Sequence, residues 1–295
     1  MKLFAVIGNP VAHSRSPEIH QAFAKQTGVA LAYRRLEAPV DADGSGFAEA
    51  ARTFFAGGGV GMNVTAPFKE AAFREATDVS ERSRLAGAAN TLTNDGSGGW
   101  RADNTDGIGL VRDLTGRLGL PLAGQRLLVL GAGGASAGIL GPLLDARPSQ
   151  LVLWNRTADK AQRLVQRFAA AYPDALLFPF SPPPADGWWA TDAVAARIRE
   201  APFDLVIHAT SLREAGEAVN VWPWLSSLCA DATFFYDLSY ADDESTFFLR
   251  WAKTGGARRC SDGFGMLVEQ AAESFRIWHG HLPETAPVFA RLRDK

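Results

Sequence analysis

A short apolar run at residues 127–130 leads directly into the glycine-rich segment GAGGAS, residues 131–136, and then into a stretch with helical periodicity. A strand, a glycine turn and a helix N-terminus in this order suit a diphosphate, because glycine lets the backbone approach the anion and the helix offers free N–H groups. Ser136 replaces the third glycine of the usual G-x-G-x-x-G pattern, and a small residue still fits there. The alternative is a plain strand–helix turn. Either way, this segment predicts an α/β fold.

The next predicted strand, residues 150–154, ends in Asn155, Arg156 and Thr157. NAD-binding proteins usually place Asp or Glu near this point, where it accepts a hydrogen bond from the ribose 2′-hydroxyl. Here a guanidinium stands instead, with Lys160 one helical turn further on, and these cations would stabilise a 2′-phosphate. The sequence therefore favours NADP over NAD, although Asn155 or Thr157 could also simply cap the following helix.

Apolar runs of strand length alternate with helical segments and divide into two α/β series. This rhythm predicts two α/β domains that flank a cleft, the first with a mostly parallel sheet and the second Rossmann-like. Strands are expected at residues 3–8, 31–36, 60–65, 88–93, 100–102, 126–130, 150–154, 175–180, 203–209 and 233–238. Helices are expected at residues 17–27, 45–56, 67–75, 106–118, 134–146, 158–171, 246–253, 265–279 and 287–293.

Composition excludes several classes of protein. Lys and Arg number 30 against 32 Asp and Glu, so the basic excess of a nucleic-acid-binding protein is missing. No apolar run approaches the roughly 18 residues of a membrane helix, and the first ten residues lack the apolar core of a signal peptide. Two cysteines and five histidines show neither a disulfide framework nor metal-ligand spacing. We therefore expect a cytoplasmic protein without a metal.

Polar residues gather where elements of the first series begin or end. Ser14 and Ser16 precede Pro17, a pattern typical of a helix start. Ser16 could be the N-cap, and the same spot could bind a small carboxylate. Asn63 and Thr65 lie on one face at the end of the third strand, which is the edge where open α/β sheets bind ligands.

Lys69 follows at the start of a predicted helix, where a cation is mildly unfavourable against the helix dipole. On local grounds such a lysine is usually a solvated surface residue. Asn90 and Asp106 also stand at the ends of predicted elements, and Asp106 could simply cap the helix that follows it.

Taken together, eight segments in order resemble the shikimate dehydrogenase family, and the resemblance runs nearly end to end. The segments are GNPVAHSRSPEIH (8–20), NVTAPFK (63–69), LAGAANTL (85–92), DNTDG (103–107), GAGGAS (131–136), NRT (155–157), YDLSY (236–240) and DGFGMLVEQA (262–271). The resemblance implies an oxidoreductase that interconverts 3-dehydroshikimate and shikimate with NADP, a step towards chorismate and the aromatic amino acids. It also implies a substrate domain of residues 1–105 and 263–295, and an NADP domain of residues 106–262.

By the same resemblance, Lys69 and Asp106 form the catalytic pair, and Lys69 either passes a proton or polarises the carbonyl. The substrate would be held by Ser14, Ser16, Asn63, Thr65, Asn90, Asp106, Tyr240 and Gln270. NADP would be held by Glu81, Gly131, Ala132, Gly133, Gly134, Ala135, Asn155, Arg156, Thr157, Lys160, Thr210, Leu238 and Gly263.

The chain departs from the family pattern in places expected near the cofactor. His208 stands where an Asn usually precedes Ala-Thr-Ser, and residues 212–215 read Leu-Arg-Glu-Ala where a glycine and a methionine usually follow. Ala137 occupies a position that is basic in some members. These departures bear on cofactor affinity and loop geometry more than on the type of reaction. Residues 181–189, rich in Pro and Trp, are predicted to form a surface loop.

Two other functions stay open at this point. A quinate/shikimate dehydrogenase would have to accommodate an extra tertiary hydroxyl near Ser14 and Ser16. A catalytically silent NADP-binding regulator is expected to have lost Lys69 or Asp106, and both are present. The protein is expected to act on small molecules as a monomer or a homodimer.

Overall fold

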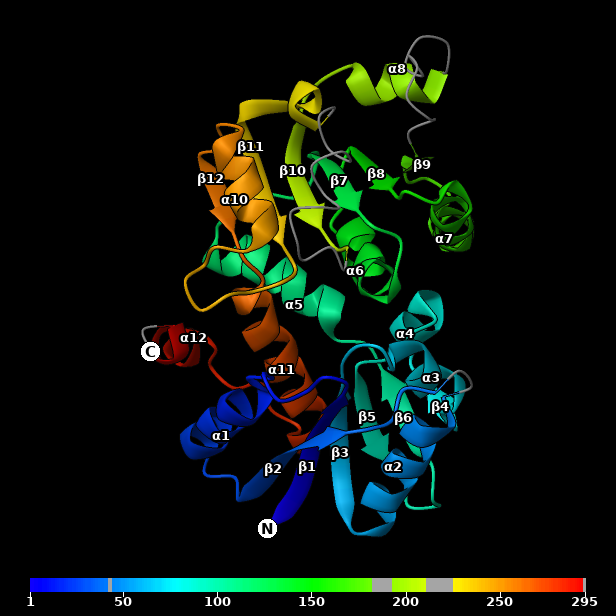
Figure 1. The fold of residues 1–295 in the computed structure, drawn as a ribbon, viewed down its shortest axis with the longest axis vertical. Coiled ribbons are helices and arrows are strands. Elements are labelled where there is room, and N and C mark those ends of the chain that lie inside the picture. Colours follow the sequence, from blue (N-terminus) through cyan, green and yellow to red (C-terminus); the bar gives the residue numbers. More distant parts are fainter. Residues whose placement is uncertain (42–43, 182–192, 211–224, 294–295) are drawn as a thin grey trace. The chain divides into compact units, whose positions relative to one another are not determined.

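The structure is a computed structural model in which the chain folds into two compact units, each built around a six-stranded sheet (Figure 1). It describes residues 1–41, 44–181, 193–210 and 225–293. Unit 1 comprises Met1–Arg117, Ala137–Gly141 and Gly265–Lys295, and unit 2 comprises Leu118–Ser136 and Pro142–Phe264. The predicted class of two α/β domains is confirmed. The functional domain limits, 1–105 with 263–295 and 106–262, and the cleft between the domains stay predictions.

The sheet of unit 1 has the strand order β2-β1-β3-β5-β6-β4. Its strands are β1 (Lys2–Gly8), β2 (Leu31–Glu37), β3 (Gly59–Val64), β4 (Asp78–Val79), β5 (Thr91–Asn94) and β6 (Trp100–Asp103). β1 pairs in parallel with β2 and β3, and β4 pairs in parallel with β6. β5 runs antiparallel to β3 and β6, so β5 and β6 form a hairpin. The two-residue strand β4 was not predicted.

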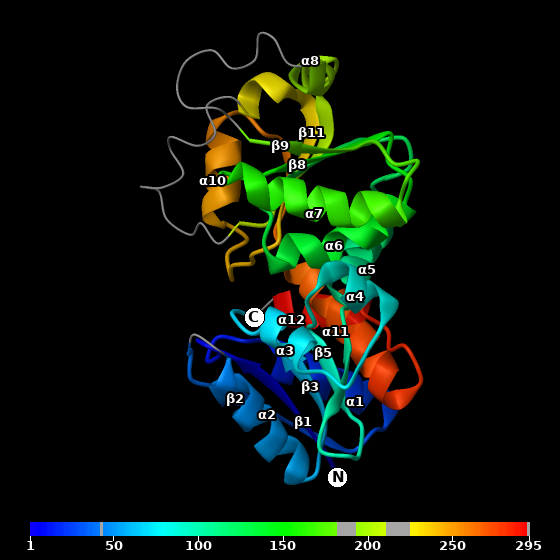
Figure 2. The ribbon, with the colours of Figure 1, turned by 90° about the vertical axis from the view of Figure 1, so that its right-hand side faces the viewer.

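Helices cover both faces of this sheet (Figures 1 and 2). The helices of unit 1 are α1 (Ser16–Thr27), α2 (Ser45–Ala56), α3 (Lys69–Arg74), α4 (Glu81–Ala86), α5 (Asp106–Arg112), α11 (Phe264–His279) and α12 (Ala286–Arg293), with a π-helical turn at Asp113–Arg117. Alternation along β1 explains the two layers. Phe4 and Val6 cluster with Trp278 of α11, whereas Ala5 and Ile7 cluster with the phenylalanines of α2.

The sheet of unit 2 has the strand order β12-β11-β10-β7-β8-β9, and its neighbouring strands all run parallel. Its strands are β7 (Arg126–Leu130), β8 (Gln150–Trp154), β9 (Leu177–Phe180), β10 (Phe203–His208), β11 (Cys229–Asp237) and β12 (Arg259–Ser261). Its helices are α6 (Gly134–Asp145), α7 (Ala158–Ala171), α8 (Ala193–Arg199) and α10 (Phe247–Thr254), with a 3₁₀ turn at Leu225–Leu228. The parallel order confirms the predicted Rossmann-like arrangement.

Some local predictions were wrong. Ser16 is not an N-cap, because α1 begins at Ser16 itself and has no side-chain cap. α3 begins at Lys69 and not at Pro67, because a turn closed by the bond from the Phe68 N–H to the Thr65 carbonyl precedes it. Thr157 occupies the N-cap position of α7 without a capping bond. Asp106 is likewise the first residue of α5, not its cap.

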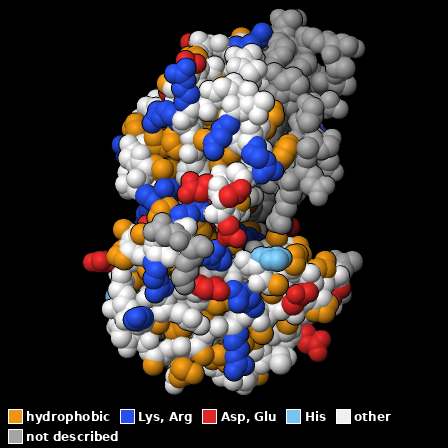
Figure 3. Space-filling model, turned by 60° about the vertical axis from the view of Figure 1, so that its left-hand side comes forward, with side chains coloured by type: hydrophobic (Ala, Val, Ile, Leu, Met, Phe, Trp, Pro, Cys, Tyr) orange, Lys and Arg blue, Asp and Glu red, His pale blue; other side chains and the backbone are white. Residues whose placement is uncertain are grey.

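On the face drawn in Figure 3, Lys and Arg side chains are interspersed with Asp and Glu side chains. Among the described residues, no helix has the length and apolar character needed to cross a membrane. In the same part of the chain, no three His, Cys, Asp or Glu side chains gather as a metal site would require. The predicted loop at residues 181–189 lies, after Ser181, outside the described residues, as do residues 212–215.

Candidate active site

The two predicted catalytic side chains face each other in unit 1. Lys69 is the first residue of α3 and Asp106 is the first residue of α5. Lys69 Nζ lies 2.5 Å from Asp106 Oδ2, and the side chains are 21 % and 7 % exposed. An ammonium group has three hydrogens, and this carboxylate oxygen occupies one of them. Lys69 can therefore donate to a further acceptor, such as a substrate oxygen, while Asp106 holds it in place.

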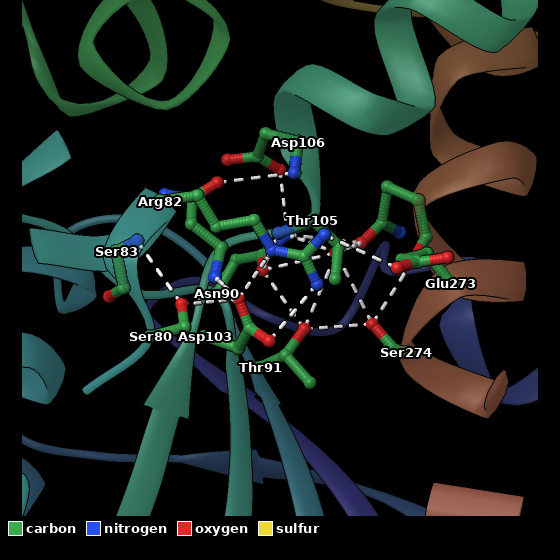
Figure 4. Close-up of polar contacts among 12 residues, drawn as sticks. Ser80, Arg82, Ser83, Asn90, Thr91, Asp103, Thr105, Asp106, Glu273 and Ser274 are labelled. Carbon is green, nitrogen blue, oxygen red and sulfur yellow. Dashed lines mark hydrogen bonds and ion pairs between the residues drawn. The ribbon is translucent and has the colours of Figure 1, made fainter. Parts of the chain in front are cut away.

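The amide of Asn90 fixes Asp106 from the other side. Asn90 Nδ2 donates to Asp106 Oδ1 over 2.8 Å, and Asn90 Oδ1 accepts from the N–H of Thr105 over 2.8 Å. Gln270 Oε1, on α11, lies 3.2 Å from Asn90 Nδ2. Figure 4 shows Asn90, Thr105 and Asp106 converging where α5 begins. The structure thus brings together four predicted site residues, Lys69, Asn90, Asp106 and Gln270.

The loop that carries Asp106 is held by an ion pair that the sequence did not reveal (Figure 4). Arg82 of α4 donates to both oxygens of Asp103, over 2.5 and 3.0 Å. Asp103 Oδ1 also accepts from the N–H of Asn104 over 2.7 Å, and Asn104 Oδ1 accepts from the N–H of Asp106 over 3.1 Å. Hydrogen bonds therefore run without a break from Arg82 through Asp103 and Asn104 to Asp106, which restricts where the Asp106 carboxylate can lie.

Arg82 also anchors the loop to α11 through Glu273. Arg82 Nη1 lies 3.2 Å from Glu273 Oε1. The same buried carboxylate pairs with Arg112 at 3.0 Å and with Arg276 at 2.7 Å. Burial alone would raise the pKa of Glu273, but hydrogen bonds from Arg276 and the charges of Arg112 and Arg82 lower it to about 2. Glu273 lies one helical turn beyond Gln270, so these four charges hold the helix that presents Gln270.

Asn63, predicted to lie near the substrate, is buried and bonded to protein groups on all sides. Its Oδ1 accepts from the Tyr33 hydroxyl over 2.6 Å and lies 3.1 Å from His20 Nε2. Its Nδ2 donates to Ser274 Oγ over 2.9 Å. Burial lowers the pKa of His20 to about 3, so the imidazole is neutral near pH 7. This network joins α1, β2, β3 and α11, and Asn63 serves it as a structural link.

The two predicted carboxylate-binding serines lie together at the N-terminus of α1. Ser14 Oγ donates to Ser16 Oγ over 3.2 Å. Arg35 of β2 holds this segment, because its guanidinium donates to the Ser14 carbonyl over 2.6 and 2.9 Å and pairs with Glu18 at 2.8 Å. Thr65, just after β3, is half-buried. Two hydroxyls beside a helix N-terminus with no side-chain cap suit a small anion.

The glycine turn of unit 2 has the geometry that a diphosphate requires. Gly131 follows β7 with φ at +114°, a conformation that side chains rarely adopt. α6 then begins at Gly134 without a side-chain cap, and a Cβ built on Gly133 or Gly134 would meet nothing within 4 Å. Asn155 Oδ1 steadies the turn by accepting from the N–H of Ala132 over 3.1 Å. The backbone is therefore open to an anion at the start of α6, which fits NADP.

The remaining predicted NADP residues of unit 2 surround the carboxyl ends of its strands. Arg156, Thr157 and Lys160 are exposed after β8. Thr210 lies beside the glycine turn, since its Cγ2 is 3.1 Å from a Cβ built on Gly131.

After β11, the backbone around Leu238 approaches Gly263 so closely that a Cβ on the glycine would collide with the Leu238 carbonyl oxygen. Two predicted residues belong to a different unit from most of their sets. Tyr240, expected at the substrate, is in unit 2, with its ring 5.9 Å from that of Phe264. Glu81, expected at the cofactor, is in unit 1, where it is exposed and pairs with Arg84 at 3.4 Å.

Three family models match the chain. The first describes a shikimate dehydrogenase substrate binding domain and matches residues 6–92. The second describes shikimate / quinate 5-dehydrogenase and matches residues 114–178. The third describes a shikimate 5′-dehydrogenase C-terminal domain and matches residues 263–293.

Relatives similar to this chain extend over nearly its whole length. Shikimate dehydrogenase (NADP(+)) of Hahella chejuensis is 44 % identical over 297 residues, which cover 100 % of this chain and 99 % of the relative. An Ael1 enzyme from Pseudomonas putida has a crystal structure that is 39 % identical, with a TM-score of 0.80, covering 99 % of this chain and 98 % of that one. Shikimate 5-dehydrogenase from Thermus thermophilus, solved in complex with NADP(H) and shikimate, is 30 % identical with a TM-score of 0.79, covering 100 % of this chain and 99 % of that one.

Proposed function

The chain belongs to the shikimate dehydrogenase family, and on that premise we propose that it catalyses the reversible NADPH-dependent reduction of 3-dehydroshikimate to shikimate. The observation that carries this proposal is the Lys69–Asp106 ion pair, tied by Asn90 to the loop before α5. A solvated surface lysine would lack such a partner, whereas Lys69 is held against a buried carboxylate that Asn90 also contacts. The test is the appearance of NADPH absorbance at 340 nm when the purified protein meets NADP and shikimate, and its disappearance with 3-dehydroshikimate.

Lys69 acts at the oxygen on ring carbon 3. The cofactor bound by unit 2 would supply the redox chemistry, since NADPH would be the hydride donor to that carbon in the reduction and NADP+ the hydride acceptor in the oxidation. In the reduction, the carbonyl oxygen gains negative charge, and the Lys69 ammonium donates a hydrogen bond and then a proton to it. In the oxidation, the neutral amine of Lys69 takes the hydroxyl proton and becomes the ammonium. Asp106 keeps the ammonium oriented through its 2.5 Å contact, and Asn90 keeps Asp106 in place.

The substrate is bound by unit 1 through two kinds of group. Ser14 and Ser16 hold the carboxylate at the start of α1, where hydroxyls and the helix N-terminus favour an anion. Amide and hydroxyl groups just after β3, just before β5 and on α11 bind the ring hydroxyls, and we assign this role to Thr65, Asn90 and Gln270. Asp106 also contacts a ring hydroxyl. Asn63 supports the substrate site through its buried hydrogen bonds. Tyr240 of unit 2 contributes to substrate binding.

Shikimate is expected to be preferred over quinate. Quinate carries a further tertiary hydroxyl beside the carboxylate, and the hydroxyls of Ser14 and Ser16 are already 3.2 Å apart and bonded to each other. A site without a partner for that hydroxyl leaves it unpaired, so kcat/KM for quinate should be lower by about tenfold or more. Steady-state rates with both acids at saturating NADP measure the ratio. Comparable efficiency with quinate would instead identify a quinate/shikimate dehydrogenase.

NADP is bound by unit 2. Gly131, Ala132, Gly133, Gly134 and Ala135 receive the diphosphate, and the open space at Gly133 and Gly134 favours this role. The 2′-phosphate lies beyond β8, with Asn155, Arg156, Thr157 and Lys160. Thr210, Leu238 and Gly263 lie towards the nicotinamide. We further assign Glu81 of unit 1 to this cofactor.

Arg156→Ala is expected to weaken NADP binding by about 10- to 100-fold, since a charge-assisted pair with phosphate contributes about 1.5–3 kcal/mol. The dissociation constant for NAD, which lacks the 2′-phosphate, should barely change. Fluorescence titration with each reduced cofactor measures both constants. Arg163→Ala removes the same charge from an exposed position further along α7 and serves as the control. An equal loss for both cofactors would place the 2′-phosphate elsewhere.

A catalytically silent NADP-binding regulator is a less well supported function than the enzyme, because the Lys69–Asp106 pair is intact. We also propose a cytoplasmic location, which the two free thiols, Cys229 and Cys260, favour. The proposed groups all come from a single chain, so a monomer or a homodimer would serve equally.

A further inference from the structure

Helix α6 contacts the loop before α5 at a glycine. Residues 137–141 of α6 belong to unit 1, as do Asn104 and Asp106. Gly138, in the second turn of the helix, is buried. A Cβ built on Gly138 would lie 2.9 Å from Asn104 Oδ1, 3.0 Å from Asn104 Nδ2 and 3.2 Å from Asp106 Oδ2. The backbone of α6 therefore packs directly on the side chains at the start of α5.

Asn104 cannot move aside freely, because both ends of its amide are hydrogen-bonded. Its Nδ2 donates to the Ala88 carbonyl over 3.0 Å, and its Oδ1 accepts from the N–H of Asp106 over 3.1 Å. Asn104 is also only 2 % exposed. A methyl group at position 138 would therefore have to break one of these bonds or push α6 away from the loop, because interiors are closely packed.

The carboxylate of Asp106 is held by two other side chains as well. Its Oδ1 accepts from Asn90 Nδ2 over 2.8 Å, and its Oδ2 lies 2.5 Å from Lys69 Nζ. Oδ2 is also the oxygen that a Cβ at position 138 would approach. A side chain on Gly138 would therefore press on the oxygen that contacts the Lys69 ammonium, and on the amide that holds the Asp106 backbone.

We propose that Gly138 is a positioning residue for the dehydrogenase reaction. Because it has no side chain, α6 supports Asn104 and Asp106 directly, and this contact fixes the carboxylate where it orients Lys69. Gly138 acts through Asp106 and does not itself touch the substrate. The inference rests on the proposed function, since it takes Lys69 and Asp106 as the groups at the reacting carbon.

The first test compares Gly138→Ala with the wild type in shikimate oxidation at saturating NADP. The variant is expected to lower kcat about tenfold or more, because a small displacement of a group that orients a reacting one is costly. The dissociation constant for NADPH should barely change. Gly116→Ala is the matched control, since Gly116 is exposed in unit 1 and a Cβ built there would meet nothing within 4 Å.

A glycine needed only for helix packing makes a different prediction. Alanine favours a helix more than glycine does, so Gly138→Ala does not weaken α6 by itself. If Gly138 served packing alone, its substitution would change the free energy of unfolding in urea and leave kcat of the folded enzyme as in the wild type. That result would overturn the inference.

A second variant tests the route through Asn104. Asn104→Ala frees the space that a Cβ at position 138 needs, and it should lower kcat by itself because the Asp106 N–H loses its acceptor. Adding Gly138→Ala should then cost little, so the double variant should be folded and about as active as Asn104→Ala, even if Gly138→Ala alone does not fold. A double variant that is unfolded, or in which the two losses simply multiply, would overturn the inference. A wild type that does not oxidise shikimate would instead overturn the proposed function, and the inference with it.

Discussion

Lys69→Ala is expected to lower kcat for shikimate oxidation by about 10²- to 10⁴-fold, the range typical of a lost general acid or base. The Michaelis constant for shikimate should change far less, because Lys69 acts on charge that develops at the ring oxygen in the transition state. Initial rates at 340 nm with saturating NADP measure both constants. The structure strengthens this expectation, because the ammonium is held against Asp106 at 2.5 Å and is 21 % exposed.

Two further variants separate the contributions of Lys69. Lys69→Met keeps most of the side-chain stem and removes the charge, so it should be as slow as Lys69→Ala if the ammonium is what matters. Lys25→Ala removes an exposed lysine from α1 in the same unit and should leave the rates unchanged. Near-normal turnover of Lys69→Ala would mean that Lys69 is a surface lysine without a catalytic role. Asp106 would then be the remaining candidate for the catalytic group.

Several strands of unit 2 were predictable, because a buried parallel strand is a short apolar run bounded by turns. The predictions for β7, β8 and α7 match the structure residue for residue. The short elements were missed. β4 has two residues, and its pairing with β6 depends on tertiary contacts. α4 did carry local signals, since Ser80 caps it by accepting from the N–H of Ser83 and Gly87 ends it in the left-handed region.

The central polar residues of the candidate site were predictable, whereas the ion pairs that support them were not. Lys69, Asn90 and Asp106 fall in motifs that the resemblance covers, and the structure brings them into contact. Arg82 and Glu273 lie 191 positions apart and meet only after the sheet of unit 1 has formed. No local pattern identifies such a pair. Helical spacing was the one available hint, because Glu273 lies three residues after Gln270 on α11.

Glu273→Gln is expected to lower the free energy of unfolding of unit 1 at pH 7 by about 3 kcal/mol, the scale for breaking a buried ion pair from one side. The amide is nearly isosteric, so the loss reflects charge rather than volume. The carboxylate is buried and touches Arg82, Arg112 and Arg276, which would be left without their common counter-charge. Urea unfolding of the wild type and the variant measures the difference, and Glu49→Gln, exposed on α2, is the matched control.

The pH dependence of this difference identifies its origin. Arginine contacts outweigh burial and lower the pKa of Glu273 from 4.5 to about 2 in the folded protein. A carboxylate whose pKa falls on folding stabilises the fold fully above its unfolded pKa and loses that stabilisation as the pH drops through its folded pKa. The gap between wild type and Glu273→Gln should therefore be largest near pH 7 and narrow steadily below pH 4.5. A gap that stays constant from pH 7 to pH 3 would mean that Glu273 stabilises α11 by packing, and that its charge does not hold the helix against the loop of Asp106.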